Sequence, residues 1–215
     1  KSTDGGLNFS SVADMDDYIW SLSSCPATTP RGVLSGDSIV VVKRSGATGN
    51  NEVVCSNVSM QNLNYSYNNN IDFISGVVQN YPEVSASGDT IIAVWQDNRE
   101  SYQDCYMSFS TEGPHALQGS LSFTDTSFFG QKIDPDVEFK NGIAHLVYLN
   151  STEHKIVYLK ATFQSPSNSN EHFHQNTLRK ISQIDILGRK TEINKGVQIV
   201  VDEKGGVKKR IILKN

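Results

Sequence analysis

A unit of about fifty residues recurs along the chain, and this repeat limits the possible folds more than any other feature of the sequence. The three copies occupy residues 30–59, 81–110 and 134–162. Gly36 aligns with Gly88 at an offset of 52 residues, and Asn141 follows 53 residues later. Each copy starts near a proline, turns at glycine or Asn-Gly, and continues as apolar stretch, polar loop and second apolar stretch. The repeat therefore predicts one structural unit used three times.

The first apolar stretch of each copy indicates what that unit is. Residues 39–42, 91–95 and 143–148 are nearly all apolar, which is typical of a strand covered on both faces. No window shows the long 3.6-residue periodicity of an amphipathic helix. A period near fifty without helical signal is typical of β-propeller blades or a similar array of sheets. A β-sandwich with coincidental similarity is the alternative.

We therefore predict an all-β fold. It would comprise a partial β-propeller of about three four-stranded blades plus the end of a preceding one, followed by a small C-terminal β-module. Propellers usually close with about 4–8 blades, so we expect the chain to be a fragment of a longer protein.

The first residues, "KSTDGGLNF", contain Ser2, Asp4, Gly5 and Phe9, and they resemble the Asp-box of sialidase-like propellers. Serine and aspartate side chains can bond the backbone of a turn, glycine allows positive φ, and the aromatic ring would pack under the blade. A weaker copy, "STEGP", begins at Ser110 and has Glu112 in the place of the aspartate. The resemblance implies that these residues are structural and lie on the face away from the ligand site.

Charge divides the chain near residue 170. Residues 1–170 carry 9 Lys+Arg and 18 Asp+Glu (9 − 18 = −9), whereas residues 171–215 carry 10 and 5 (10 − 5 = +5). An acidic body does not attract nucleic acid, because phosphate binding needs clustered Lys and Arg. The change of sign predicts a domain boundary. We predict propeller blades over 1–163, a Ser/Asn-rich linker over 164–177 and a separate module over 178–215.

The C-terminal module contains an "LGR" turn, a "KGVQIV" strand, a Gly-Gly turn and a final "KKRIILK" strand. These motifs resemble the sorting domain of type IX secretion cargo in Bacteroidetes, although the module lacks a "YPNP"-like start. The resemblance implies sorting residues Gly188, Arg189, Lys195, Gly196, Lys208, Lys209 and Arg210. The same resemblance implies the type IX secretion machinery as partner, and a secreted or cell-surface location in a Gram-negative bacterium. A basic hairpin that caps the propeller is the alternative.

The three cysteines predict no disulfide framework and no zinc site. We expect Cys25, Cys55 and Cys105 to be buried thiols, with one disulfide plus a free thiol as the alternative. His172 and His174 stand two residues apart in the linker without a third ligand nearby, so we predict no metal site. No cofactor and no transmembrane segment are expected.

Propeller ligands usually sit over the loops that follow the second strand of each blade. The richest of these loops holds an indole, a carboxylate, an amide and a guanidinium, which can supply contact area and fixed donors. The candidate ligand-binding residues are Arg44, Trp95, Asp97, Asn98 and Arg99. An Asp97–Arg99 pair that only braces the loop is the alternative.

We predict a secreted or cell-surface module that binds a glycan or a surface protein. A sialidase or related glycoside hydrolase is one alternative, but residues 1–163 hold only three arginines and no convincing tyrosine–glutamate pair, so we name no catalytic residue. A structural spacer of a larger secreted protein is the other alternative.

Overall fold

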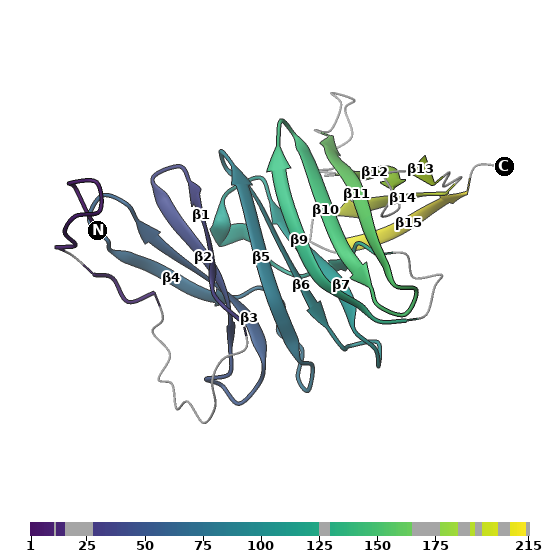
Figure 1. Ribbon diagram of the computed structural model, residues 1–215, viewed down its shortest axis with the longest axis horizontal. Helices are drawn as coiled ribbons and strands as arrows, with labels where there is room; N and C mark the ends of the chain where they lie inside the picture. The colour runs from purple at the N-terminus through teal and green to yellow at the C-terminus, as the bar shows by residue number, and fades with distance from the viewer. Residues whose placement is uncertain are drawn as a thin grey trace.

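The computed structural model describes residues 1–10, 12–15, 28–124, 130–164, 177–184, 190–191, 195–201 and 207–213. Within these ranges the regular structure is antiparallel β-strand, apart from one 3-10 helix, η1 (Pro114–Ala116) (Figure 1). The predicted all-β class is confirmed. None of the described helical structure is long and apolar enough to span a membrane.

The strands form three sheets that follow one another along the chain. The first sheet contains β1 (Arg31–Ser35), β2 (Ser38–Ser45), β3 (Glu52–Ser59) and β4 (Tyr65–Asn70) in that order. The second contains β5 (Gln79–Ser87), β6 (Thr90–Asp97), β7 (Asp104–Ser110) and β8 (Leu121–Ser122). The third begins with β9 (Lys132–Lys140), β10 (Ile143–Asn150) and β11 (Lys155–Gln164). Each copy of the sequence repeat supplies the first three strands of one sheet.

The turn between the first two strands of each sheet forms where the repeat predicts it. Gly36, Gly88 and Asn141 adopt φ angles of 55°, 61° and 53°. This left-handed region is easily reached by glycine and is tolerated by asparagine. The aligned residues therefore share a backbone conformation, which explains why the repeat conserves their spacing within the chain.

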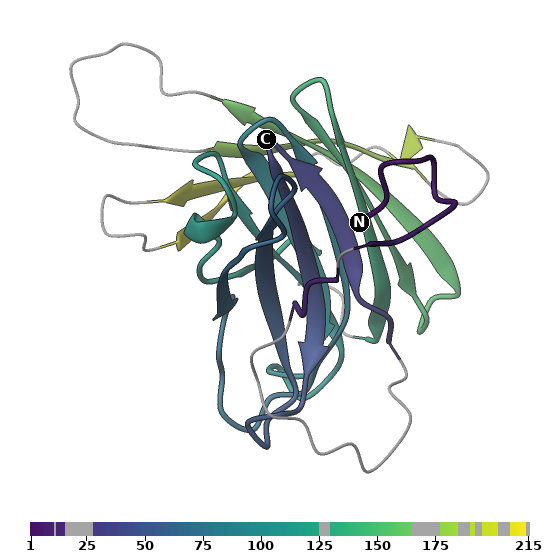
Figure 2. The same ribbon diagram turned by 90° about the vertical axis from the view of Figure 1, so that its left-hand side faces the viewer.

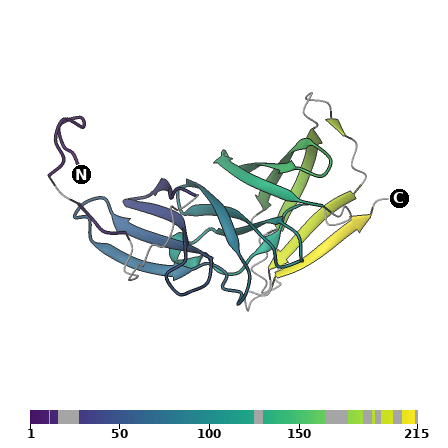
Figure 3. The ribbon, with the colours of Figure 1, turned by 60° about the horizontal axis from the view of Figure 1, so that its bottom comes forward.

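The first strands of the three sheets, β1, β5 and β9, lie next to one another. Ser35 Oγ donates to the carbonyl of Gly88 at 3.0 Å, which joins the turn regions of the first and second sheets. The amide of Phe139 donates to Ser85 Oγ at 2.9 Å, which joins the second and third sheets. Figure 3 shows the sheets in succession from the N-terminal segment to the C-terminal strands, and Figure 2 shows the first sheet toward the viewer. The sheets thus meet through their first strands.

Two apolar layers fill the spaces between the sheets, and β6 contributes to both. Ile91, Ala93 and Trp95 belong to a cluster with residues of the first sheet. Ile92 and Val94 belong to a cluster with residues of the third sheet. All five are fully buried. Successive side chains of a strand point to opposite faces, so a continuous apolar run is what a central sheet requires.

Cys55 and Cys105 are buried cysteines, one in each apolar layer. The expectation of buried thiols is confirmed for these two residues, and Cys25 lies outside the described residues. Burial raises the pKa of Cys105 well above its ordinary value, with the nearby charge of Asp104 acting in the same direction. Both thiols therefore act as small apolar core residues.

Strands of the C-terminal region extend the third sheet. β12 (Thr177–Ile184) pairs with β11, β14 (Lys195–Val201) pairs with β12, and β15 (Val207–Leu213) pairs with β14. The short β13 (Lys190–Thr191) also pairs with β12. Lys195 and Gly196 open β14, and 208–210 lie on β15, whereas 188–189, 202–206 and most of the predicted linker lie outside the described residues. The domain boundaries stay a prediction.

Candidate ligand-binding face

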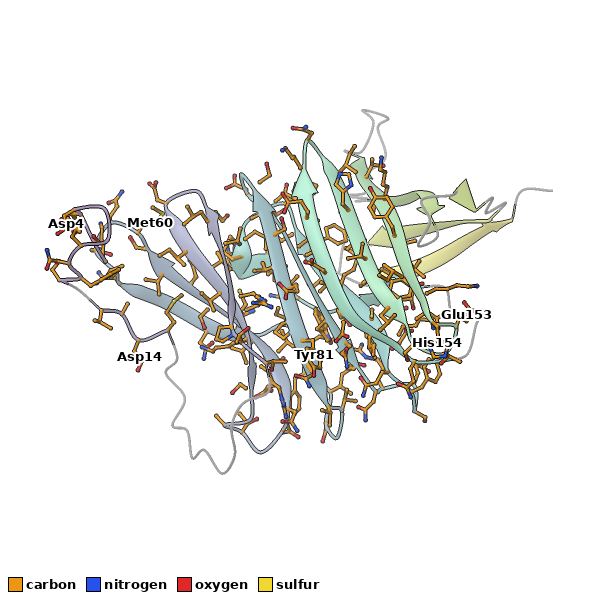
Figure 4. All side chains as sticks on the ribbon, in the orientation of Figure 1. Asp4, Asp14, Met60, Tyr81, Glu153 and His154 are labelled. Carbon is orange, nitrogen blue, oxygen red and sulfur yellow. The ribbon has the colours of Figure 1, made fainter. Side chains whose placement is uncertain are left out.

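The strands that precede the predicted recognition loops all end at one end of the sheets. β2, β6 and β10 end at Ser45, Asp97 and Asn150, two or three residues beyond the apolar stretches 39–42, 91–95 and 143–148. Trp95 and Asp97 therefore belong to β6 itself, and the loop comprises 98–103. Figure 4 shows Tyr81, Glu153 and His154 toward this end, and Asp4 and Met60 toward the opposite end. We call the first end the loop face.

The carboxylate of Asp97 organises the second of these loops. It accepts a hydrogen bond from Trp95 Nε1 at 3.2 Å and from the backbone amide of Arg99 at 3.1 Å. It also accepts the Nε–H of Arg99 at 2.9 Å, and its side chain is fully buried. The short spacing of the three residues lets one carboxylate fix the indole, the loop backbone and the guanidinium together.

Arg99 continues this network into two other loops. Its Nη1 lies 3.0 Å from Asp72 Oδ2, in the connection between the first and second sheets, and donates to Ser120 Oγ at 2.8 Å. Ser120 in turn donates to Asp72. The guanidinium carbon stands 3.8 Å from the centre of the Tyr106 ring. Cation–π contact and charge-assisted bonds thus hold the guanidinium on several sides.

Burial and charge shift two pKa values in this network. Burial would lower the pKa of Arg99, but its bonds to Asp97 and the charge of Asp72 outweigh that effect and raise it. Burial raises the pKa of Tyr106 far above its ordinary value, and the charges of Asp97 and Asp104 add to the increase. At neutral pH the network therefore keeps a cationic guanidinium over a neutral phenol.

These contacts correct part of the predicted ligand set. Trp95 is fully buried in the apolar layer between the first two sheets, so its ring has no surface to offer a ligand. The bracing role of the Asp97–Arg99 pair is what the geometry shows. Asn98 is partly buried, and its side-chain oxygen accepts the amide of Val78 at 2.9 Å. Asp97, at the end of β6, and the loop residues Asn98 and Arg99 together fix the shape of the loop.

Arg44 is the remaining candidate of the predicted set. It is partly exposed at the end of β2, and its Nε donates to Asn51 Oδ1 at 3.2 Å. Its role in ligand binding stays a prediction.

A second buried network lies at the start of the third strands. Asp104 is 1% exposed and accepts hydrogen bonds from Ser122 at 3.2 Å and from Thr124. Lys132 Nζ, also 1% exposed, lies 3.5 Å from Asp104 Oδ1. Glu52 occupies the aligned position in the first sheet, where it is buried and accepts Thr48 Oγ1 at 2.7 Å. These carboxylates are engaged inside the fold rather than presented to a ligand.

The turn that resembles an Asp-box is held by hydrogen bonds of its serine and aspartate side chains. Ser2 Oγ donates to Asp4 Oδ1 at 2.7 Å and accepts the amide of Gly6 at 2.9 Å, while Asp4 accepts the amide of Asn8 at 3.0 Å. Gly5 has the expected positive φ of 75°, and Gly6, which the sequence analysis did not single out, has one of 91°. The bonds from Asn8 come first among the causes that lower the pKa of Asp4 to about 2.

The expectation that Phe9 packs under a sheet is wrong in this structure. Its side chain is 73% exposed, because the described residues around the turn include no strand of a sheet that could cover the ring. The turn instead contacts the first sheet through Lys1 Nζ, which donates to the carbonyls of Met60 at 2.7 Å and Gln61 at 3.1 Å. The box therefore sits beside the turn that joins β3 to β4.

Like Ser2, a serine accepts the amide two residues later at the turn after the third strand of the first and second sheets. Ser59 Oγ accepts the amide of Gln61 at 3.2 Å, and Ser110 Oγ accepts the amide of Glu112 at 3.0 Å. Ser110 thus bonds the backbone of its own turn, whereas the side chain of Glu112 is exposed. The copy at Ser59 was missed because it lacks an acidic residue two positions later.

Sequence reasoning also missed an irregularity in the first strands of the second and third sheets. The register of β5 shifts between Asn80 and Glu83, and the register of β9 shifts opposite Val147 and Leu149. Prolines inside a strand are typical of such bulges. The repeated prolines at 30, 82 and 135 were the signal that could have indicated them.

The described residues contain no group of three or more His, Cys, Asp or Glu side chains that could hold a metal ion. The two linker histidines, His172 and His174, lie outside the described residues.

Comparison with solved structures finds distant similarity to enzymes that act on carbohydrates. An α-L-arabinofuranosidase from Podospora anserina shares 10% identity at a TM-score of 0.41, over 85% of this chain and 62% of that one. A Trypanosoma rangeli sialidase mutant shares 8% identity at a TM-score of 0.42, over 84% of this chain and 36% of that one. A Bacillus subtilis arabinanase shares 11% identity at a TM-score of 0.35, over 86% of this chain and 93% of that one. The chain thus spans less than two thirds of the first two proteins. No family model and no curated protein matches the sequence.

Replacing Asp97 should destabilise the protein far more than breaking a surface ion pair. Asp97→Ala leaves a largely buried guanidinium and an indole N–H without their shared partner, so we expect a loss of about 3–5 kcal/mol in the free energy of unfolding. Lys155→Ala, which removes an exposed pair with Glu153, should cost less than about 1 kcal/mol. Denaturant titration measures both. Similar losses in the two variants would contradict the network described above.

Proposed function

We propose that the three sheets are consecutive blades of a β-propeller, and that residues 1–10 end a preceding blade. Three observations support this. Each sheet starts a new copy of the repeat, and β1, β5 and β9 lie side by side. The Ser-containing turn also recurs after the third strand of the first two sheets. The Asp-box turn contacts this turn in the first sheet.

We further propose that this propeller is an extracellular binding module for a glycan or a surface protein. The observation that carries the proposal is the convergence of the loops after β2, β6 and β10 on one face, away from the Asp-box turn (Figure 4). Loops on a rigid scaffold are where binding residues concentrate. The buried network around Asp97 supplies that rigidity in the second loop.

The arrangement of the arginines favours a binding module over the sialidase alternative. A sialidase needs three guanidinium groups that converge on one substrate carboxylate. Here Arg31 pairs with Glu83, Arg44 bonds Asn51, and Arg99 bonds Asp97 and Asp72. Each of the three arginines of residues 1–163 is therefore held in its own place by its own partner.

If the ligand binds at the loop face, a bulky label on that face should block binding and a label at the opposite end should not. In a Cys25→Ser background, Glu100→Cys places a thiol on the exposed loop after β6, and Met60→Cys places one at the opposite end. A polyethylene-glycol maleimide on Glu100→Cys should abolish binding to glycan arrays or to intact cells, whereas the same label on Met60→Cys should leave binding unchanged. Absence of any binding by the unlabelled chain, or blocking from Met60→Cys alone, would refute the proposal.

We also propose that the C-terminal strands carry the export signal. The lysines and arginine at 195 and 208–210 belong to β14 and β15, which form the far edge of the third sheet, whereas β12 is the strand that pairs with β11 among the described C-terminal strands. A truncation can therefore remove the proposed signal and still keep β12, the strand that pairs with β11.

Two truncations test this in a bacterium that carries the type IX machinery. Ending the protein after residue 189 removes β13, β14 and β15 but keeps β12, so export should be lost while thermal stability stays near that of the whole chain. Ending it after residue 176 also removes β12, so export and stability should both fall, because the edge of β11 loses its partner. Secretion that continues without residues 190–215 would refute the sorting role.

A further inference from the structure

A row of side chains lies at or just before the start of the first strand of each sheet, at the loop face. Thr29, Tyr81 and Asp134 each stand immediately before a proline, at offsets of 52 and 53 residues, and all three are exposed. Contacts beside the row join neighbouring sheets: Thr28 Oγ1 donates to Asn80 Oδ1 at 3.1 Å, and the amide of Asp134 donates to Gln96 Oε1 at 2.8 Å. We call Thr29, Tyr81 and Asp134 the pre-proline row.

Two of the three residues of this row have an unfavourable backbone conformation. Tyr81 and Asp134 have φ angles of 51° and 52°, a left-handed conformation that a bulky residue rarely adopts. Such a conformation is unfavourable for a non-glycine residue and persists only where its surroundings impose it. The register shifts in β5 and β9 fall at these two residues, and bulges of this kind re-aim a side chain.

The surface next to the row is acidic. Arg31, Glu83 and Asp136 follow the same three prolines, and Arg31 Nε lies 2.5 Å from Glu83 Oε1. Burial raises the pKa of Glu83, the pair with Arg31 opposes that rise, and the charge of Asp136 adds to it. Counting Asp134, this patch carries three carboxyl groups and one guanidinium. A ligand with its own carboxylate would be repelled there.

We propose that the pre-proline row binds a neutral oligosaccharide, with the Tyr81 ring against an apolar sugar face and the Asp134 carboxylate accepting hydroxyl hydrogen bonds. Tyr81 is 40% exposed, and tyrosine offers a rigid ring with a polar end, which suits a ligand that is apolar on its faces and polar at its edges. A carboxylate is a strong acceptor for hydroxyl groups. The inference rests on the proposed function and narrows its ligand to an uncharged glycan.

An array that carries neutral oligosaccharides beside their sialylated forms tests the class of ligand. We expect binding to neutral members and none to their sialylated forms. Titration calorimetry with the best neutral member then compares variants. Tyr81→Ala and Asp134→Asn should each weaken binding by about tenfold or more, whereas Tyr81→Phe should stay within about threefold. Phe73→Ala, which removes a 54% exposed ring from the loop before β5, is the matched control and should bind as the unchanged chain does.

Thermal denaturation of each variant separates lost binding from lost folding. A variant with an unchanged melting temperature and lost binding supports the row as the site. Preference for sialylated members, or full binding by both Tyr81→Ala and Asp134→Asn, overturns the inference. If the label on Glu100→Cys still blocks binding in that case, the proposed function stands with its site elsewhere on the loop face. Absence of any glycan or cell binding overturns both.

Discussion

Burial of strand β6 on both faces is the constraint on which the other features depend. Its side chains alternate between the layer shared with the first sheet and the layer shared with the third, so the second sheet cannot leave either neighbour without exposing apolar surface. The same strand ends in Asp97, which fixes the loop that follows. Core packing and loop geometry are therefore set by one continuous segment, from Ile91 to Arg99.

Hydrogen bonds between polar groups add to the apolar packing that holds the sheets together. Hydrogen bonds between neighbouring sheets satisfy backbone groups that a free sheet would leave open: Ser35 bonds the carbonyl of Gly88 in the turn after β5, and Ser85 accepts the amide of Phe139. The loop networks around Asp97 and Asp104 use their carboxylates inside the fold. The pre-proline row, with its left-handed backbone at Tyr81 and Asp134, lies at the loop face.

The sequence predicted the strands well because burial on both faces leaves a plain signal, a continuous apolar run such as 91–95. It predicted the turns at Gly36 and Gly88 because their φ angles restrict the residue type. It failed for Trp95, because a large aromatic residue near a loop looks the same whether it faces solvent or the core. It missed Tyr81 and Asp134, because a bulge depends on pairing with β6 and β10, which a single strand does not reveal.

The contact between β5 and β9 tests the side-by-side arrangement of the sheets most directly. The amide of Phe139 is bonded to Ser85 Oγ, 54 residues away, in a buried environment. Amide hydrogen exchange followed by NMR should show slow exchange at Phe139 in the unchanged chain. In Ser85→Ala the exchange at Phe139 should become much faster, while the amides that pair β10 with β11 keep their protection. Rapid exchange at Phe139 in the unchanged chain, or protection unaffected by Ser85→Ala, would contradict the arrangement.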